Sequence, residues 1–504
     1  MTEFTDLVRR SLREDTREEF DRRVDKQADR LADACRVGRL DNPCFGLGLE
    51  LEAYAVDADG RLTHVPKEVL AGPCEKELGL HNVEFNTEAS RFNEPGLVSQ
   101  ATQLRENYQR VQELAAAADV EIVLDAMWTV PPEAGAAAYL SAVREEDGVM
   151  IAENMTPSPR YCAIDNDLLG AMDGEVSLSV PGADCQFPSI LFESLASSIQ
   201  PHVQIPETEA YPQYHNTAVR TLGPVLALAT NSPLLPPELY DVDDPYRLLE
   251  ETPHELRIEV FEQSINGAWE KVRFPEDIDS TPEIADTLVA DQTCAPFLRE
   301  WLEDGDRETL PAKFWELAHK RGTYWRWLRA VTGGQPVGDG NEWSIRIEYR
   351  PLPTQPTVRD NVGFQWLVAG LVRGLCGADH PITTLDRSAA ERSFYEAVAN
   401  GIDADLAWVT ADGDRTGDRS VIFEEVFAFA RRGLRDQGVD EDSIDEYLGP
   451  IEARWTERTT PSQWKLDRVR QHLDAGSEFE AAVTEMQTEY IERAGTGAPL
   501  VRWE

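Results

Sequence analysis

The sequence predicts an α+β protein, in which a curved, mostly antiparallel sheet forms a funnel with helices packed outside it and a helical region follows at the C-terminus. Several short segments alternate apolar and polar residues, which is the period of a strand, and segments with helical apolar spacing lie between them. A chain of 504 residues also exceeds one ordinary core. We therefore divide it into an N-terminal helix packed on the core (1–40), a central mixed domain (41–385) and a helical C-terminal region (386–504).

The composition excludes two classes of partner. Asp and Glu total 92 against 48 Lys and Arg, and the resulting net charge of -44 would repel nucleic acid and anionic membranes. Aromatic and aliphatic residues are retained, so this charge indicates a surface adapted to high salt and not a disordered acidic tail. The seven cysteines are scattered without a close-spaced pair, which favours free thiols in the cytoplasm. We expect no secretion signal and no transmembrane helix.

The strand predicted at residues 45–54 carries the feature around which the function is organised. Phe45 and the leucines at 47, 49 and 51 share one face, whereas Gly46, Gly48, Glu50 and Glu52 share the other. The two carboxylates are one strand repeat apart, roughly 6.5–7 Å. Paired acids behind glycines suit a divalent cation and a bulky ligand, although an amphipathic surface strand would show the same pattern.

The other elements follow from periodicity and from stop signals. Residues 57–60 (Asp-Ala-Asp-Gly) form a hairpin-type turn, and residues 231–233 (Asn-Ser-Pro) end a helix. Thr357 begins another helix as its N-cap, and Ser477 with Glu480 forms a capping box. We predict helices at 4–37, 98–117, 213–230, 283–330 (mostly helical), 358–375 and throughout 386–504 apart from an acidic loop at 436–446; strands at 62–65, 82–88, 120–124, 198–205, 256–261 and 343–350; and loops with short helices at 130–190.

Four predicted strands present related polar faces: Glu50 and Glu52, Glu84 and Asn86, His202 and Gln204, and Glu348 and Arg350. They could be unrelated amphipathic strands of a half-exposed sheet. However, exposed faces elsewhere carry acids at mixed spacing, and histidine is rare in this chain. If the faces converge, the acids form a funnel whose charge two or three Mg²⁺ ions would neutralise while they clamp a nucleoside triphosphate. Arg350 would then face a transferring phosphoryl group.

Five short motifs in order resemble the glutamate–cysteine ligase family, within the carboxylate–amine ligases that share the glutamine-synthetase catalytic fold. They cover roughly residues 43 to 375. The motifs are Gly48-Leu49-Glu50-Leu51-Glu52, Val83-Glu84-Phe85-Asn86-Thr87, Pro201-His202-Val203-Gln204, the segment from Leu226 to Pro233, and Ile347-Glu348-Tyr349-Arg350-Pro351-Leu352 with Gln355-Pro356-Thr357.

The resemblance implies roles for individual residues of the central, catalytic domain. Arg350 would contact the phosphoryl or acyl-phosphate group, and Arg257 would be a second phosphate contact, or else a surface charge on an edge strand. The implied metal ligands are Glu50, Glu52, Glu84, His202 and Glu348, with Glu77 a weaker candidate, and the implied nucleotide contacts are Gly48, Gln204 and Arg346. Better-known members often carry His or Asn at the position of Gln204, and residues 386–504 have no recognised counterpart.

The implied activity is ATP-dependent amide formation with ATP and Mg²⁺. Glutamate would form a γ-glutamyl phosphate, and cysteine would displace phosphate to give γ-glutamylcysteine, the first step of glutathione biosynthesis. Two alternatives stay open. The acceptor could be another amine or amino acid, or the chain could be a catalytically silent relative whose C-terminal helices serve protein association. The sequence leaves the acceptor and the oligomeric state undetermined.

Overall fold

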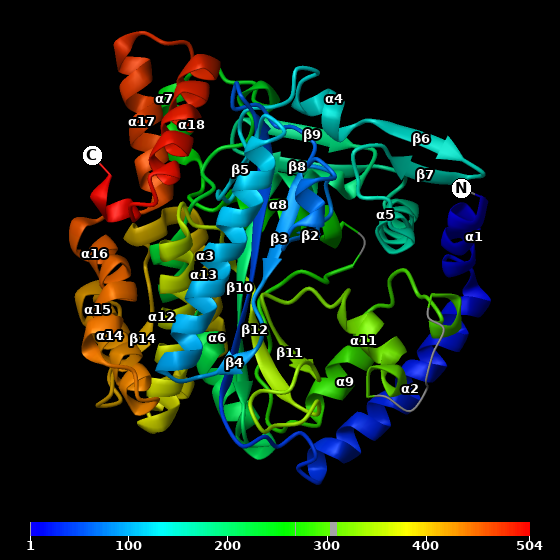
Figure 1. The fold of residues 1–504 in the computed structure, drawn as a ribbon, viewed down its shortest axis with the longest axis vertical. Coiled ribbons are helices and arrows are strands. Elements are labelled where there is room, and N and C mark those ends of the chain that lie inside the picture. The colour runs from blue at the N-terminus through cyan, green and yellow to red at the C-terminus, as the bar shows by residue number, and fades with distance from the viewer. Residues whose placement is uncertain (1, 268, 303–309, 504) are drawn as a thin grey trace.

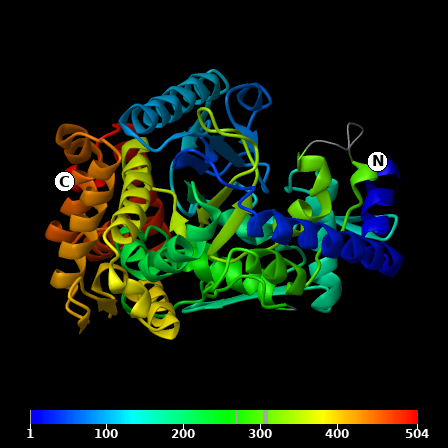
Figure 2. The ribbon, with the colours of Figure 1, turned by 90° about the horizontal axis from the view of Figure 1, so that it is seen from below.

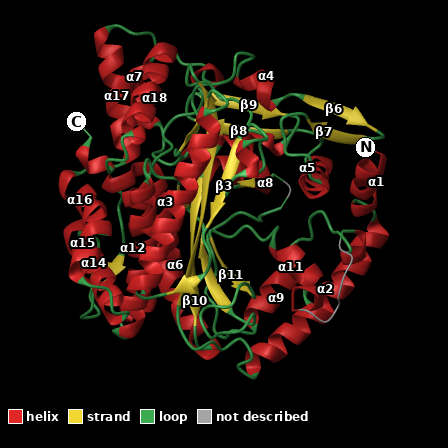
Figure 3. Cartoon of the chain, viewed as in Figure 1, coloured by secondary structure: helices red, strands yellow, loops and turns green. Residues whose placement is uncertain are grey.

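An antiparallel sheet runs through the centre of the protein in the computed structural model, which describes residues 2–267, 269–302 and 310–503 (Figures 1 and 3). Its strand order is β11-β12-β10-β1-β3-β2, with β13 beside β10 and with β4 and β5 beside β1. Every pairing in the sheet is antiparallel, and the sheet does not close on itself. The predicted α+β fold is therefore confirmed. The strands are β1 (Gly46–Asp57), β2 (Glu75–Lys76), β3 (Asn82–Asn86), β4 (Ser90–Arg91), β5 (Val120–Val123), β10 (Ser198–Ile205), β11 (Leu328–Thr332), β12 (Ile345–Tyr349) and β13 (Leu352–Pro353).

Long helices cover one face of the sheet, on the left in Figure 1. The alternation in β1 turns Leu47, Leu49 and Leu51 into this layer, where each is at most 2% exposed. Burial of such side chains is worth roughly 1.5–3 kcal/mol each, so it fixes which face of the sheet is left for polar side chains. The helices are α3 (Glu94–Ala116), α6 (Tyr211–Ala229) and α12 (Val358–Gly377), with α13 (Arg387–Asn400) on α6 and α14 (Arg419–Asp436) on α12.

The polar face of the sheet looks toward the N-terminal helices and several shorter elements. Figure 2, seen from below, places the N-terminal helices and the C-terminal helices at opposite sides of the molecule. The elements on the N-terminal side are α1 (Thr2–Ser11), α2 (Glu14–Arg36), α5 (Pro159–Ala171), α9 (Glu283–Ala290), α10 (Leu310–Lys313) and α11 (Trp315–Arg321). Two hairpins lie at the upper end, together with α4 (Ala136–Leu140) and α8 (Leu256–Asn266). They are β6 (Val143–Glu146) with β7 (Val149–Ala152), and β8 (Val176–Val180) with β9 (Ala183–Phe187).

The C-terminal region joins the rest of the chain in two ways. Helices α13 to α16 contribute to the main hydrophobic core, whereas α17 and α18 build a smaller core with Leu234 and Leu249. A fully buried ion pair between Lys465 of α17 and Asp125 also ties this pair of helices to the end of the sheet. The domain limits at 40 and 385 stay predictions. The remaining helices are α7 (Pro245–Glu251), α15 (Glu441–Tyr447), α16 (Gly449–Glu457), α17 (Pro461–Ala475) and α18 (Phe479–Gly495), and β14 (Trp408–Val409) pairs with β15 (Arg415–Thr416).

Several predicted elements were wrong. Residues 256–261 lie in helix α8 and not in a strand. The prediction failed because six residues are too few to separate an apolar period of two from one of 3.6. The segment 283–330 ends in strand β11, and its residues 303–309 lie outside the described residues. The N-terminal helix is two helices, α15 overlaps the second half of the predicted acidic loop, and the segment 130–190 includes hairpin strands. Thr357 caps α12 as expected, but α18 begins after Glu478 without a side-chain cap.

Candidate active site

Strand register places the predicted polar residues on one face of the sheet. Residues directly opposite each other in neighbouring strands point to the same face. Glu52 of β1 is opposite Glu84 of β3, and His202 of β10 is opposite Glu348 of β12. Gly48 of β1 is opposite His202 of β10, so the polar faces of β1 and β10 are adjacent. The polar faces that the sequence shows separately are therefore contiguous across β3, β1, β10 and β12.

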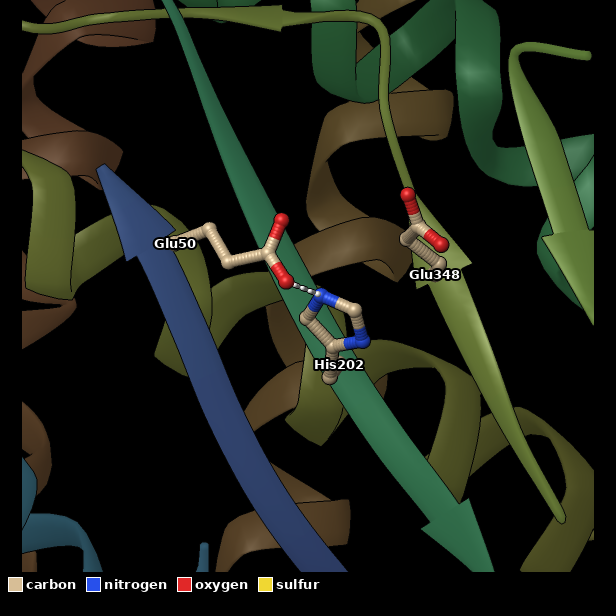
Figure 4. A group of neighbouring side chains, drawn as sticks. All are labelled: Glu50, His202 and Glu348. Atoms are coloured by element: carbon tan, nitrogen blue, oxygen red, sulfur yellow. Dashed lines mark ion pairs between the residues drawn. The ribbon is translucent and has the colours of Figure 1, made fainter. Parts of the chain in front are cut away.

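The centre of this face is a group of three side chains, Glu50, His202 and Glu348 (Figure 4). Each offers one ligand atom, and these atoms all lie within 4.8 Å of one another. His202 Nε2 is 3.0 Å from Glu50 Oε1. On the other side of the ring, Arg346 Nε donates a hydrogen bond of 3.0 Å to His202 Nδ1. The imidazole is thus fixed between an acid and an arginine.

Glu348 is held by two arginines. Arg329 of β11 contacts both carboxylate oxygens, at 2.9 and 2.8 Å, and Arg350 donates to one of them. Burial would raise the pKa of Glu348, but Arg329, Arg350 and His202 outweigh it and hold that pKa well below the usual range. Arg350 also donates to Gln200 Oε1 at 2.7 Å. Glu348 therefore stays ionised and fixes the direction of Arg350.

Three further acids, Glu52, Glu77 and Glu84, form a second group on the β3 side. Burial raises the pKa of all three, and repulsion among them adds to it for Glu77 and Glu84, reaching about 8 for Glu77 and about 9 for Glu84. Their partners are few. Glu52 accepts from the Ser198 backbone N–H at 2.6 Å, and Glu77 accepts from the Tyr161 hydroxyl at 3.3 Å. Without a cation, Glu77 and Glu84 are therefore held largely protonated at neutral pH.

The donor set fits a hard divalent cation. Carboxylate oxygens with one imidazole are ligands that Mg²⁺ or Mn²⁺ accepts. His202 Nε2 is buried and lacks an aligned hydrogen bond although Glu50 is near, so its direction is left for a ligand. A neutral imidazole that ligates through Nε2 carries its proton on Nδ1. Arg346 would then have to release Nδ1 when a metal is bound.

A cavity of about 160 Å³ opens beside the three central residues. Gly46 and Gly48 form part of its wall, together with Glu50, His202, Gln204 and Arg346. A Cβ added at Gly48 would touch only His202 Cβ, at an ordinary contact distance of 3.6 Å. Packing against the surrounding protein atoms therefore does not require a glycine at this position. A Cβ at Gly46 would instead lie 2.8 Å from Val337 Cγ2. The missing side chain at Gly48 therefore leaves room in the cavity for a ligand.

Arg257 lies behind the site and lines none of the cavities described here. It is buried at the start of α8, beside Glu255, with Nε 3.4 Å from Glu255 Oε1. Its Nη2 donates to the backbone carbonyl of Pro351 and, at 3.4 Å, to that of Arg350. Arg257 thus contacts the turn that carries Arg350, and the alternative of an exposed edge-strand charge is wrong.

Sequence reasoning missed the arginines that complete the site. Arg329 and Arg321 come from the segment that was predicted to be mostly helical, and Gln200 was predicted on the polar face of its strand but was given no role in the site. A signal was present, because Val331 and Thr332 are β-branched and Gly333-Gly334 follows as a turn. Recognising that strand would have placed Arg329 opposite Glu348, as the register does.

The comparisons with known proteins agree with one another. The profile of glutamate–cysteine ligase family 2 matches residues 46–496. The solved glutamate–cysteine ligase of Francisella tularensis in complex with AMP superposes with a TM-score of 0.51 at 13% identity, over 92% of this chain and 90% of that one. A bifunctional glutathione synthetase from Pasteurella multocida gives 0.50 at 14% identity, over 89% of this chain and 52% of that one. No curated protein sequence matches. No helix in the described part of the chain is long and apolar enough to cross a membrane.

Proposed function

Because the chain belongs to glutamate–cysteine ligase family 2, we propose that it is an ATP-dependent ligase that joins the γ-carboxylate of glutamate to an amine, with cysteine as the foremost acceptor. The observation that carries the proposal is the convergence of Glu50, His202 and Glu348 beside Arg350 on one face of the sheet. A site that pairs ionised acids with arginines in this way is suited to phosphoryl transfer.

The acids of the site are the groups that would hold Mg²⁺. Bound there, Mg²⁺ would neutralise the carboxylates and the triphosphate, which lowers the repulsion between ATP and this very acidic face. Glu50, His202 and Glu348 would hold one ion, and Glu52 and Glu84, with Glu77, would hold a second or a third. The raised pKa values of Glu77 and Glu84 support this assignment, because they reflect carboxyl groups that are buried and that repel one another, a combination that a bound cation would relieve.

Arg350 has the position of the charge-stabilising group. The γ-carboxylate of glutamate attacks the terminal phosphate of ATP, and ADP leaves as an acyl phosphate forms. The amine then attacks the acyl carbon, and inorganic phosphate leaves. Negative charge is present on the phosphoryl oxygens in both steps, and a guanidinium fixed by Glu348 and Gln200 stabilises it without having to reorient. The chain itself supplies no nucleophile.

Arg257 supports this arrangement from behind. Its contacts with the Arg350 and Pro351 carbonyls hold the backbone from which the Arg350 side chain extends. Through these contacts it positions Arg350. A direct contact with phosphate, which the family resemblance implies, would require its guanidinium to leave these carbonyls.

Cysteine is the foremost acceptor because it is the acceptor named in the description of the family. All seven cysteines are free thiols, which supports the expected cytoplasmic location. The silent-relative alternative is disfavoured by the two intact groups of acids.

The test is phosphate release with ATP, Mg²⁺ and glutamate in high salt, with cysteine and a panel of other amines added singly. We expect amine-dependent release that Glu348→Gln reduces at least about 100-fold, whereas Glu106→Gln on the exposed side of α3 leaves it unchanged. Turnover with other amines but not with cysteine would reassign the acceptor. A wild-type protein that releases no phosphate with any amine would reject the ligase proposal.

A further inference from the structure

The C-terminal helices α17 and α18 lie at the outer edge of the molecule and are not part of the site described above (Figure 1). Both nevertheless send a side chain to Asn231, a fully buried residue just beyond the end of α6. Lys465 of α17 donates a hydrogen bond of 2.8 Å to the Asn231 carbonyl. The Tyr490 hydroxyl of α18 accepts one of 3.1 Å from Asn231 Nδ2. Asn231 is therefore a point of attachment for the helix pair.

From Asn231 the contacts continue to Glu255, which directly precedes helix α8. The Asn231 backbone N–H donates to Glu255 Oε2 and the Ser232 hydroxyl donates to Glu255 Oε1, both at 2.8 Å. Arg257, in the first turn of α8, places its Nε 3.4 Å from the same carboxylate. Its backbone N–H also donates to Ser232 Oγ at 3.1 Å. Glu255 and Ser232 thus hold Arg257 by its side chain and by its backbone.

These contacts end on the segment that carries Arg350. The Arg257 guanidinium donates to the carbonyls of Arg350 and Pro351, at the start of that segment. Asn231 Nδ2 donates to the carbonyl of Thr354, at its other end, at 2.7 Å. The segment 350–354 is therefore held at both ends by groups that meet at Asn231.

Stability alone does not account for such a network. Its members between the helix pair and the segment 350–354 are all at most 1% exposed: Asn231, Ser232, Glu255 and Arg257. A buried ion pair often adds no stability over apolar side chains of similar size. A buried network whose members are hydrogen-bonded instead fixes one arrangement of the groups that it joins. A fixed direction is what a guanidinium needs in order to stabilise charge on a phosphoryl group without reorienting.

We propose that Tyr490, Asn231 and Glu255 are positioning residues of the ligase, through which the C-terminal helix pair holds Arg257 and, by way of it, Arg350. The proposal rests on the proposed ligase function. It gives the C-terminal helices a part in the reaction, and it gives Asn231, which the sequence marks only as the end of a helix, a second task.

The kinetic test removes one hydroxyl. Tyr490→Phe should lower kcat for amine-dependent phosphate release about 2- to 10-fold, the worth of one net hydrogen bond, with KM for ATP and for glutamate unchanged. Tyr246→Phe is the matched control, because the exposed Tyr246 hydroxyl also donates to α17, at 2.9 Å to Asp474, but on the outside of the molecule. Its kcat should equal that of wild type. In an Arg350→Lys background Tyr490→Phe should have less effect, since a flexible lysine has no fixed direction to lose.

The physical link can also be measured without turnover. The Arg350 N–H donates to the Trp327 carbonyl at 3.0 Å and the Thr354 N–H to the Ser197 carbonyl at 3.1 Å, so these amides should exchange their hydrogens slowly. Hydrogen exchange followed by mass spectrometry should be faster in residues 350–355 of Tyr490→Phe than in wild type or Tyr246→Phe. Exchange in α3 should be the same in all three, which separates a local loosening from a global one.

Three results would each overturn the proposal: wild-type kcat in Tyr490→Phe, wild-type exchange in residues 350–355 of that variant, or the same fold-loss of kcat with and without Arg350→Lys. If circular dichroism shows that Tyr490→Phe does not fold, Asn231→Ala removes the same contact from the other side and is judged by the same measurements. A wild-type protein that releases no phosphate with any amine rejects the ligase function. Hydrogen exchange still decides whether Tyr490 holds the segment, so the two failures are distinguishable.

Discussion

Arg329 and Glu348 face each other across β11 and β12, and the guanidinium contacts both carboxylate oxygens at 2.9 and 2.8 Å. Glu348 is buried, Arg329 is partly buried, and the pair adjoins Arg350, so it fixes the acid that contacts Arg350. A two-point contact of this kind restricts rotation in a way that a single ammonium group cannot.

Arg329→Lys should therefore lower kcat for phosphate release by about 10- to 100-fold, because a lysine keeps the charge but loses the two-point contact. KM for glutamate should change much less. Steady-state kinetics in high salt measure both constants. Arg415→Lys, at an exposed ion pair with Asp386, is the matched control. Equal kcat for Arg329→Lys and wild type would show that the fixed geometry of Glu348 does not matter.

The acids around Glu84 predict a pH dependence of stability in the metal-free protein. The pKa of Glu84 is raised to about 9 and that of Glu77 to about 8, above the value of about 4.3 in an unfolded chain. Between those limits the unfolded state has lost the proton and the folded state keeps it, so the free energy of unfolding falls as pH rises from about 5 to 9.

Urea unfolding with EDTA at a series of pH values measures this slope. Glu84→Gln should make it shallower, and Glu106→Gln should not. Addition of Mg²⁺ should remove most of the slope and release protons into an unbuffered solution, because the bound ion favours the ionised acids. A metal-free slope that is identical in wild type and Glu84→Gln would show that Glu84 does not hold a proton in the folded state.

Lys465 and Asp125 predict how the C-terminal helices contribute to stability. Their charges are 2.5 Å apart, with both side chains at most 1% exposed. Lys465→Met leaves a buried carboxylate unpaired and should cost about 3–5 kcal/mol in the free energy of unfolding. Adding Asp125→Asn should recover part of that loss, because it removes the unpaired charge. Lys76→Met, on an exposed strand, should have no effect. A cost below about 1 kcal/mol for Lys465→Met would contradict the burial of the pair.

The net charge of -44 predicts a dependence on salt. Repulsion among exposed acids is screened as the Debye length falls from about 10 Å at 0.1 M to about 3 Å at 1 M. The Tm should therefore rise steadily between these concentrations, with NaCl and KCl acting alike. Thermal unfolding followed by circular dichroism measures it. A Tm that does not change with salt would show that repulsion among the exposed acids does not limit the stability of the protein at low salt.

Local patterns in the sequence were sufficient for the faces of individual strands. Alternation in residues 45–54 assigned the leucine face and the glutamate face of β1 correctly, because the period of a strand is a property of the backbone. The same reasoning failed at residues 256–261, where a short alternating run lies in a helix. Arg257 was consequently expected at a surface or at a phosphate, and the fold buries it against the carbonyls of Arg350 and Pro351.

The sequence by itself thus determined the polar and apolar faces of the main strands and the residue types that could hold a cation. Only the tertiary structure decided which of those groups meet, because the register between strands far apart in the chain sets the distances on which charge interactions depend. It brought Arg329 to Glu348, raised the pKa of Glu84 through burial and through its acidic neighbours, and closed an apolar cavity with Leu31 from a helix that the sequence places outside the site. Packing and electrostatics act through space, and no local pattern encodes them.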